Sequence, residues 1–194
     1  MTPRQFSDWF TVRNLFAAFA ALFLLTLAQA SSARADKCDA ASFVQSAGEA
    51  YDRAASSGSP VAFANAAARY SDLRSLSMFA LGKYRKDLPK AREAEYINLT
   101  RQFIGRTLKK HGSGFRGTTL EITECVKSGD GLMVTARVSS GTKVIFRLSR
   151  SGGGYTVKDV NMKGVWLAQQ MRSTFVGTIG RTGSIDGLLA YLKN

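Results

Sequence analysis

The sequence predicts an α+β fold in which helices gather on one face of a four-stranded antiparallel sheet. Two observations predict it. Between residues 40 and 110, apolar residues recur at spacings of three and four, which is typical of helices. Between residues 120 and 162 they alternate with polar residues, which is typical of antiparallel strands with one apolar face. Because helices and strands occupy separate stretches of the chain, we expect them to form separate layers.

Four helices are expected before the sheet. In the first, Phe43, Ala47 and Tyr51 share one face, and the run Ser56–Ser59 ends the helix. Pro60 opens the second helix, because proline is tolerated at a first helical position. The predicted helices span residues 40–55, 61–70, 73 to about 82, and a long stretch that follows Asp87 and Pro89 and ends near Lys110.

Four strands follow, joined by short turns that contain glycine. The third strand, for example, places Val144, Phe146 and Leu148 on one face. The predicted strands span residues 120–125, 132–138, 143–148 and 155–162. The chain then returns to helical periodicity, over residues 165–179 and, after a Gly183–Ser184 cap, 185–192.

The first 35 residues are expected to be a signal peptide rather than part of the fold. Positive charge at Arg4 and Arg13 precedes an apolar run over residues 15–28, and an Ala-x-Ala site ends at Ala35. Cleavage after Ala35 leaves residues 36–194 as a single exported domain. The alternative is a membrane anchor, but a spanning helix needs about 20 apolar residues and this run is shorter.

Export bears on the two cysteines, Cys38 and Cys125. In an oxidising compartment a single pair of cysteines usually bonds, so we expect a disulfide between the start of the mature chain and a strand. The alternative is a pair of unpaired, buried thiols. We expect no metal site, because two distant cysteines and one histidine cannot complete a zinc coordination shell.

The chain is strongly basic, with a formal net charge of +13. Removal of the signal peptide takes away three arginines and one aspartate and leaves +11. This charge favours anionic partners such as lipid head groups, membrane surfaces or acidic protein faces. We expect no nucleic-acid partner, because basic residues are not interleaved with aromatic ones as in an RNA-binding strand. The alternative is a basic surface that only aids solubility.

An enzyme is not expected. The single histidine, His111, falls at the end of a predicted helix, where the helix dipole favours its charged form. A serine nucleophile needs a base, and the sequence offers no second histidine for that role. The glycine-rich run Ser151–Gly154 joins two strands, whereas a phosphate-binding loop leads from a strand into a helix.

Three stretches near the C-terminus resemble the MlaC family of periplasmic phospholipid-binding proteins, also called the toluene-tolerance auxiliary family. They are residues 158–167 (KDVNMKGVWL), 172–175 (RSTF) and 184–188 (SIDGL). Residues 69–73 (RYSDL) and 79–84 (FALGKY) are weaker matches. The sequence departs from the family pattern at Ser71, Trp166 and Met171, and the last two fall near the closed end of the family's ligand cavity.

The resemblance implies a twisted antiparallel sheet wrapped by helices, with an internal hydrophobic cavity that holds acyl chains. It implies a non-catalytic, monomeric periplasmic lipid carrier with no cofactor and with bound lipid as its cargo. The implied partners are an inner-membrane ABC transporter complex and an outer-membrane lipoprotein complex that maintain lipid asymmetry, with transient contact to membrane surfaces. Two alternatives remain: a carrier of hopanoid or another polycyclic lipid, and an exported enzyme or adaptor on a similar fold.

Candidate residues for the cavity come from the apolar stripes and from their position in the family pattern. They are expected to contact the acyl chains because each is large and apolar. The set is Tyr70, Leu76, Phe79, Phe103, Leu108, Phe146, Val160, Val165, Leu167, Met171 and Phe175. Encounter with anionic partners is expected to use Lys83, Arg85, Lys86, Arg101 and Arg106.

Overall fold

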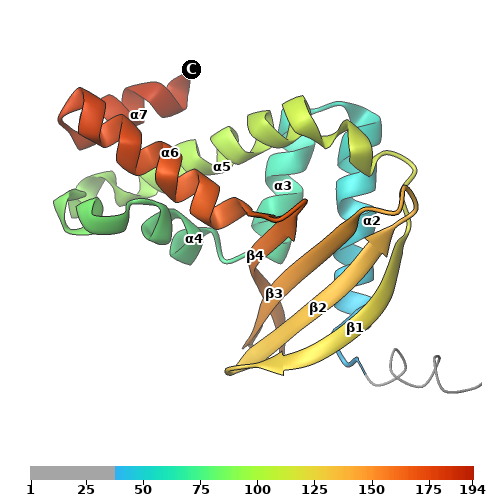
Figure 1. Cartoon of the computed structure of the whole chain (residues 1–194). Helices are drawn as coiled ribbons and strands as arrows, with labels where there is room; N and C mark the ends of the chain where they lie inside the picture. The colour runs from blue at the N-terminus through green and yellow to red at the C-terminus, as the bar shows by residue number, and fades with distance from the viewer. Residues whose placement is uncertain (1–37) are drawn as a thin grey trace, which may run out of the picture. The chain divides into compact units, whose positions relative to one another are not determined.

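The computed structural model describes residues 38–194, so the predicted signal peptide lies outside the described residues. None of the helices within this range is both long and apolar enough to cross a membrane. Figure 1 shows the elements along the chain. Their bounds are α2 (Ala41–Ser57), α3 (Pro60–Tyr70), α4 (Leu73–Ala80), η2 (Gly82–Asp87), η3 (Lys90–Arg92), α5 (Glu93–His111), η4 (Gly112–Phe115), β1 (Leu120–Ser128), β2 (Gly131–Val138), β3 (Lys143–Ser151), β4 (Gly154–Met162), β5 (Val165–Trp166), α6 (Leu167–Thr182) and α7 (Ile185–Lys193).

The α+β class is confirmed, but the sheet has five strands instead of the predicted four. The strands lie in sequence order, and each neighbouring pair is antiparallel. The predicted alternation holds in the central strands: Val134 and Ala136 of β2 and Val144 and Phe146 of β3 are buried. One face of the sheet is therefore apolar, as a half-buried antiparallel sheet requires.

The fifth strand arises from a tight hairpin at Lys163 and Gly164. Both residues have positive φ, 53° and 83°, and a two-residue turn of this kind sends the chain back antiparallel to β4. The Asn161 side chain accepts a hydrogen bond from the Gly164 backbone N–H at 3.2 Å. The prediction that residue 165 begins a helix is therefore wrong, and α6 begins two residues later.

The helix boundaries follow from local capping. The Ser59 hydroxyl accepts a hydrogen bond from the Ala62 N–H, and Pro60 occupies the first turn of α3 as expected. Helix α4 stops at Ala80, before the predicted end, because Gly82 has a φ of 56° that an α-helix cannot continue through. The 3-10 turns η2 and η3 separate α4 from α5.

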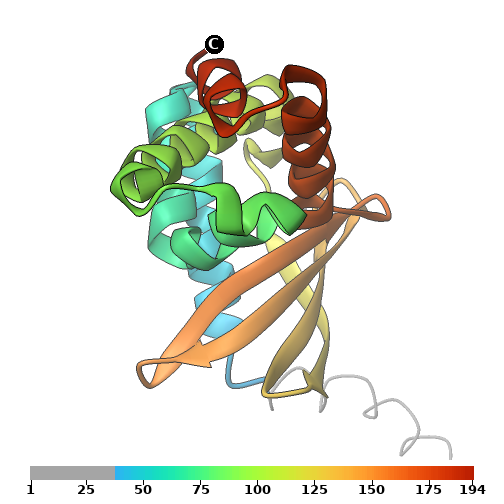
Figure 2. The same cartoon turned by 90° about the vertical axis from the view of Figure 1, so that its left-hand side faces the viewer.

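The elements form two packed groups. Helix α2 lies across one face of the sheet, while α4, α5, α6 and α7 group around one another next to it (Figures 1 and 2). Each group has its own set of buried apolar residues, which are described below. The two groups meet along β4, where Lys158 contacts Asp72 at 3.4 Å and Ser71 forms a bridge with Val157.

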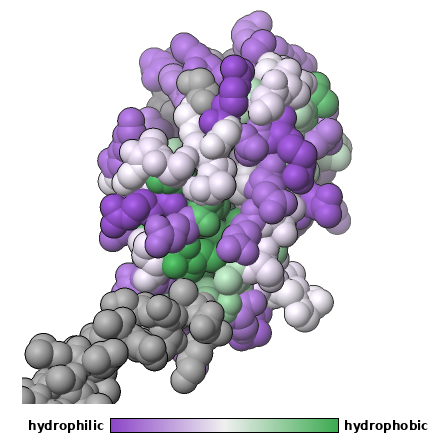
Figure 3. Space-filling view, turned by 90° about the vertical axis from the view of Figure 1, so that its right-hand side faces the viewer, coloured by the Kyte–Doolittle hydropathy of each residue, from purple (hydrophilic) through white to green (hydrophobic). Residues whose placement is uncertain are grey.

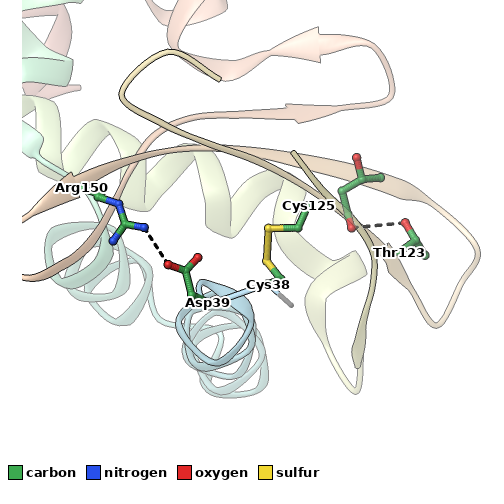
Figure 4. The surroundings of a disulfide bond; sticks show 6 residues. Cys38, Asp39, Thr123, Cys125 and Arg150 are labelled. Carbon is green, nitrogen blue, oxygen red and sulfur yellow. Dashed lines mark hydrogen bonds and ion pairs between the residues drawn. A yellow bond between two sulfur atoms is a disulfide. The ribbon is translucent and has the colours of Figure 1, made fainter. Parts of the chain in front are cut away.

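The predicted disulfide between Cys38 and Cys125 is confirmed (Figure 4). It links the first described residue to β1 across 87 residues of sequence. Beside it, the Arg150 guanidinium donates a hydrogen bond to the Asp39 carboxylate at 2.8 Å. The Tyr155 hydroxyl and, to a smaller extent, this guanidinium hold the pKa of Asp39 below its ordinary value. The start of α2 is thus fastened to the sheet at two points.

Candidate lipid-binding site

Three of the eleven candidate residues belong to a group of apolar side chains between the sheet and α2, which we call the sheet cluster. Tyr70 and Phe146 are buried in it, and Val160 packs against it half-buried. Phe43 of α2 closes one side, with its ring edge-to-face against Tyr70 at 5.6 Å between centroids. The buried members are Cys38, Ala40, Val44, Ala47, Tyr70, Val134, Ala136, Val138, Val144, Phe146, Leu148 and Val157.

Four other candidates belong to a second group, the helix cluster, which lies among α4, α5, α6 and α7. Met171 and Phe175 are buried in it, and Leu76 and Phe103 pack against it. Phe175 is its aromatic centre, in contact with Phe103 at 5.3 Å and Tyr96 at 6.3 Å between ring centroids. The buried members are Met78, Ala80, Leu81, Tyr96, Leu99, Met171, Phe175, Ile179, Ile185, Leu188, Leu189 and Leu192.

Three candidates reach the surface near the start of α6. Phe79, Val165 and Leu167 are 36%, 46% and 38% exposed, which is high for large apolar side chains. The Arg172 guanidinium lies over the Phe79 ring at 5.1 Å from its centroid, a cation–π contact. These residues therefore place apolar surface and positive charge side by side on α4 and α6.

Leu108 lies apart from the other candidates. It packs against a small group that contains Ala54, Ala55 and Phe63, between α2 and α3. The structure thus divides the eleven predicted residues among two large clusters, one small cluster and the surface. Their contact with a ligand stays a prediction.

The start of α6 is held by a residue from the sheet. Trp166 precedes the helix without a side-chain cap, and Asp159 of β4 accepts a hydrogen bond from the Ala168 N–H at 2.9 Å instead. Asp159 pairs in register with Arg147, whose guanidinium lies 4.4 Å from the Trp166 ring centroid. Because Phe146 and Leu148 point into the sheet cluster, Arg147 and the Trp166 ring lie on the opposite face of the sheet.

Several apolar residues that line these clusters were not among the candidates. Val134, Val144, Leu148 and Val157 face α2 together with Phe146, and their alternation in the strands was a sufficient signal to find them. The role of Asp159 had no local signal, because the helix that it caps begins eight residues later.

The helix cluster also contains buried polar groups. The Tyr96 hydroxyl donates a hydrogen bond to the Ser77 carbonyl at 2.7 Å, which ties α5 to α4, and burial raises the pKa of Tyr96. The Ser77 hydroxyl is fully buried and has no hydrogen-bond partner among the described residues. Within residues 38–194 there is no group of three or more acidic, histidine or cysteine residues arranged to hold a metal ion.

Part of the sheet cluster reaches the surface. On the side that lies to the right in Figure 1, apolar side chains form a patch bordered by polar ones (Figure 3). Leu120 and Ile122 of β1 pack against the sheet cluster while remaining half-buried. Helix α2 therefore does not cover this cluster completely.

Comparison with known proteins places the chain in a family. The family model described as MlaC protein matches residues 46–194. The chain belongs to the MlaC family. The match covers α2 from Ser46 and every later element, so the resemblance carried by the C-terminal stretches is confirmed. Within the first of those stretches, residues 158–167, Asp159 caps α6 and Lys163 and Gly164 form the hairpin.

A solved structure has the same fold as this MlaC-family chain. It is a phospholipid-binding protein from Ralstonia solanacearum in complex with a phospholipid. The two chains superpose with a TM-score of 0.68 and are 19% identical, over 80% of this chain and 96% of the other. At this identity the comparison establishes the fold. A search of curated proteins found no significant match.

Proposed function

We propose that the protein is a periplasmic carrier that binds a phospholipid by its acyl chains and shuttles it between the outer and inner membranes. The observation that carries the proposal is the division of the apolar interior into a sheet cluster and a helix cluster in a fold shared with a phospholipid-bound structure. Membership of the MlaC family supports the same function. The bound lipid is cargo, and the carrier itself catalyses no reaction.

The acyl chains lie between the two clusters in this proposal. Phe146 and Val160 line the sheet side, and Leu76, Met171 and Phe175 line the helix side. The exposed residues Phe79, Val165 and Leu167 would border the opening, and the head group would remain near solvent beside Arg172. At β4 two polar contacts join the groups: Lys158 pairs with Asp72, and Asp159 accepts a hydrogen bond from the Ala168 N–H.

Lipid exchange requires docking. Burial of a CH₂ group contributes about 0.8 kcal/mol, so two long acyl chains represent roughly 20 kcal/mol of transfer from water. A site that binds so strongly does not release its ligand into water on a useful timescale. Transfer to a membrane or a membrane-bound partner costs little, because one apolar environment replaces another. The direction of transfer is then set by the partner, which in this proposal is a transporter or lipoprotein complex.

Basic residues on η2 and α5 favour encounter with such partners. In the predicted set, Lys83, Arg85 and Lys86 belong to η2. Arg101 and Arg106 belong to α5. Attraction between exposed charges is screened by salt, so lipid transfer should slow as ionic strength rises from about 0.01 to 1 M. Equal transfer rates at both salt concentrations would remove the electrostatic part of the proposal.

The experiment that tests the function is lipid extraction and mass spectrometry after purification from the periplasm. We expect phospholipid from the wild-type protein, and strongly reduced lipid from Phe79→Asp and Leu167→Asp, whose side chains are exposed enough to leave the fold intact. Val126→Asp is the matched control, because Val126 is 44% exposed and its neighbour Cys125, not Val126, points toward α2. Full lipid content in both opening variants would contradict the proposed site.

The family resemblance left a polycyclic lipid as an alternative cargo, and the departures at Trp166 and Met171 left open a different lipid class. Met171 belongs to the helix cluster, but the Trp166 ring lies against Arg147 on the outer face of the sheet. Trp166 is therefore not placed to shape a cavity between the clusters, and phospholipid is the cargo that we propose.

A further inference from the structure

A groove separate from both clusters runs between the start of α3 and the middle of α5. It has a volume of about 380 Å³. Val61 and Ala64 contribute apolar surface, and Val61 is 63% exposed. The opposite wall carries Asn98, Arg101, Gln102 and Arg106 of α5. None of the eleven candidate lipid-binding residues lines it.

Close packing of the two helices creates the groove. Gly105 of α5 lies so near α3 that a Cβ atom there would stand 2.3 Å from the Pro60 carbonyl oxygen. The backbones can approach at this point only because glycine has no side chain. The longer side chains of α5 that precede and follow Gly105, among them Arg101 and Arg106, then form one wall of the groove.

The side chains of the groove are suited to bind an anion. Arg101 donates to the Asn65 side chain and Arg106 donates to the Leu192 carbonyl, so both guanidinium groups are oriented by the fold. Each guanidinium has five N–H donors and uses only part of them in these contacts. Among the described residues that line the groove, none is acidic. A carboxylate placed here would therefore gain charge-assisted hydrogen bonds without a competing negative charge.

We infer that this groove docks an acidic segment of a partner protein, in which carboxylates bind Arg101 and Arg106 and aliphatic side chains rest on Val61 and Ala64. The combination of a concave apolar floor with two oriented arginines suits a protein segment better than the flat surface of a bilayer. The inference rests on the proposed carrier function, because a carrier must dock with a membrane partner before it exchanges its cargo. It adds the surface used and the chemistry of the partner.

The test uses the purified, isotope-labelled protein and an eight-residue peptide in which pairs of leucines alternate with pairs of glutamates. Addition of the peptide should shift the NMR signals of residues 60–64 and 98–106. The matched peptide with glutamine in place of glutamate should shift them at least tenfold less at the same concentration. Equal effects of the two peptides, or shifts confined to other residues, would overturn the inference.

Three variants sharpen the result. Arg101→Gln removes one cation, and Gln102→Glu adds a negative charge at an exposed position. Each variant should therefore lower the affinity for the glutamate peptide about three- to tenfold. Lys143→Gln is the control, because Lys143 is exposed at the start of β3 and its loss changes the net charge equally. Lys143→Gln should change the affinity for the glutamate peptide less than about twofold. Unchanged binding in both groove variants would overturn the inference.

Two further measurements separate the possible failures. Vesicles that contain anionic phospholipid should bind Arg101→Gln as well as wild type; selective loss of vesicle binding, with peptide binding unchanged, would assign the groove to membranes and overturn the inference. Lipid content is measured on the same samples. Normal lipid content without peptide binding removes the docking inference alone, whereas absence of lipid from the wild-type protein removes the proposed function itself.

Discussion

The two apolar clusters are held together in different ways. The sheet cluster is held by the backbone hydrogen bonds of the sheet, by the disulfide between Cys38 and Cys125, and by the contact of Asp39 with Arg150. The helix cluster has no covalent link among the described residues. It depends on side-chain packing around Phe175 and contains a buried hydroxyl without a partner at Ser77.

In the proposed carrier, this difference predicts which side of the molecule opens for a lipid. A covalently closed sheet with its helix is a rigid wall, whereas helices joined by non-covalent contacts can separate at a lower free-energy cost. The ion pairs of Arg92 with Glu95 and Asp186 lie near the surface and contribute little. We therefore expect local opening to begin among α4, α5, α6 and α7.

The largest effect is expected from removal of the disulfide. In the chain-entropy model a cross-link across 87 residues contributes about 4–5 kcal/mol to the free energy of unfolding. The double variant Cys38→Ser with Cys125→Ser should lose this amount in urea unfolding. The reduced wild-type protein is the control and should lose the same amount. A loss below about 1 kcal/mol would mean that the disulfide is not what makes the sheet side rigid.

Truncation of the aromatic centre comes next. Phe175→Ala should lower the free energy of unfolding by about 3–5 kcal/mol, because Phe175 is fully buried between Tyr96 and Phe103. Hydrogen exchange should accelerate in α4, α5 and α6 and change little in β2 and β3. A uniform acceleration across both clusters would show that they open as one unit and would contradict the contrast.

A smaller effect is expected at the junction between α3 and α4. Asp72 accepts hydrogen bonds from the Ser75 N–H and hydroxyl, and these contacts together with Lys158 lower its pKa. A lowered pKa stabilises the fold above the ordinary value of 3.8, and this contribution is lost as pH falls through the folded-state value. Asp72→Ala should cost about 1 kcal/mol at pH 7.

The pH dependence supplies the check on that variant. An aspartate carboxyl group is ordinarily half-ionised at about pH 4. The difference in unfolding free energy between wild type and Asp72→Ala should therefore be constant from about pH 5 to 7 and should shrink below about pH 4. A difference that stays the same down to about pH 2 would mean that the charge of Asp72 does not contribute.

The last expected effect is similar in size to that of Asp72→Ala and has the opposite sign. Ser77→Ala removes a buried hydroxyl that has no partner and leaves the Ser77 carbonyl free to accept from Tyr96. It should raise the free energy of unfolding by about 1 kcal/mol. If this stabilisation closes the helix cluster, lipid uptake should slow in the same variant. A destabilised Ser77→Ala protein would indicate that the hydroxyl is hydrogen-bonded.

The sequence predicted the regular elements well because their periods are set by the backbone. Alternation identified the inward faces of β2 and β3, and spacing of three and four identified α2 and α5. β5 was missed because its hairpin places Lys163, a residue other than glycine, at positive φ, and no local pattern signals this. The same holds for Asp159, whose partner is a helix end outside its own strand.

The candidate site was harder to predict than the fold. Periodicity identifies a residue as buried but does not assign it to a cluster, so Phe146, Phe175 and Leu108 appeared equivalent in the sequence although they lie in three different groups. The family resemblance also suggested that Trp166 lies near the cavity, whereas its cation–π contact with Arg147 places it on the outer face of the sheet. Side-chain direction after a tight turn depends on the turn geometry, which the residue pattern does not reveal.

The central claim is that acyl chains lie between the sheet cluster and the helix cluster. The most direct measurement is NMR line broadening with a phospholipid that carries a spin label near the end of one acyl chain. We expect broadening of backbone signals on both sides, at Phe146 of β3 and at Met171 and Phe175 of α6, with little effect at Val126. Broadening that is confined to exposed residues, with both clusters unaffected, would contradict the claim.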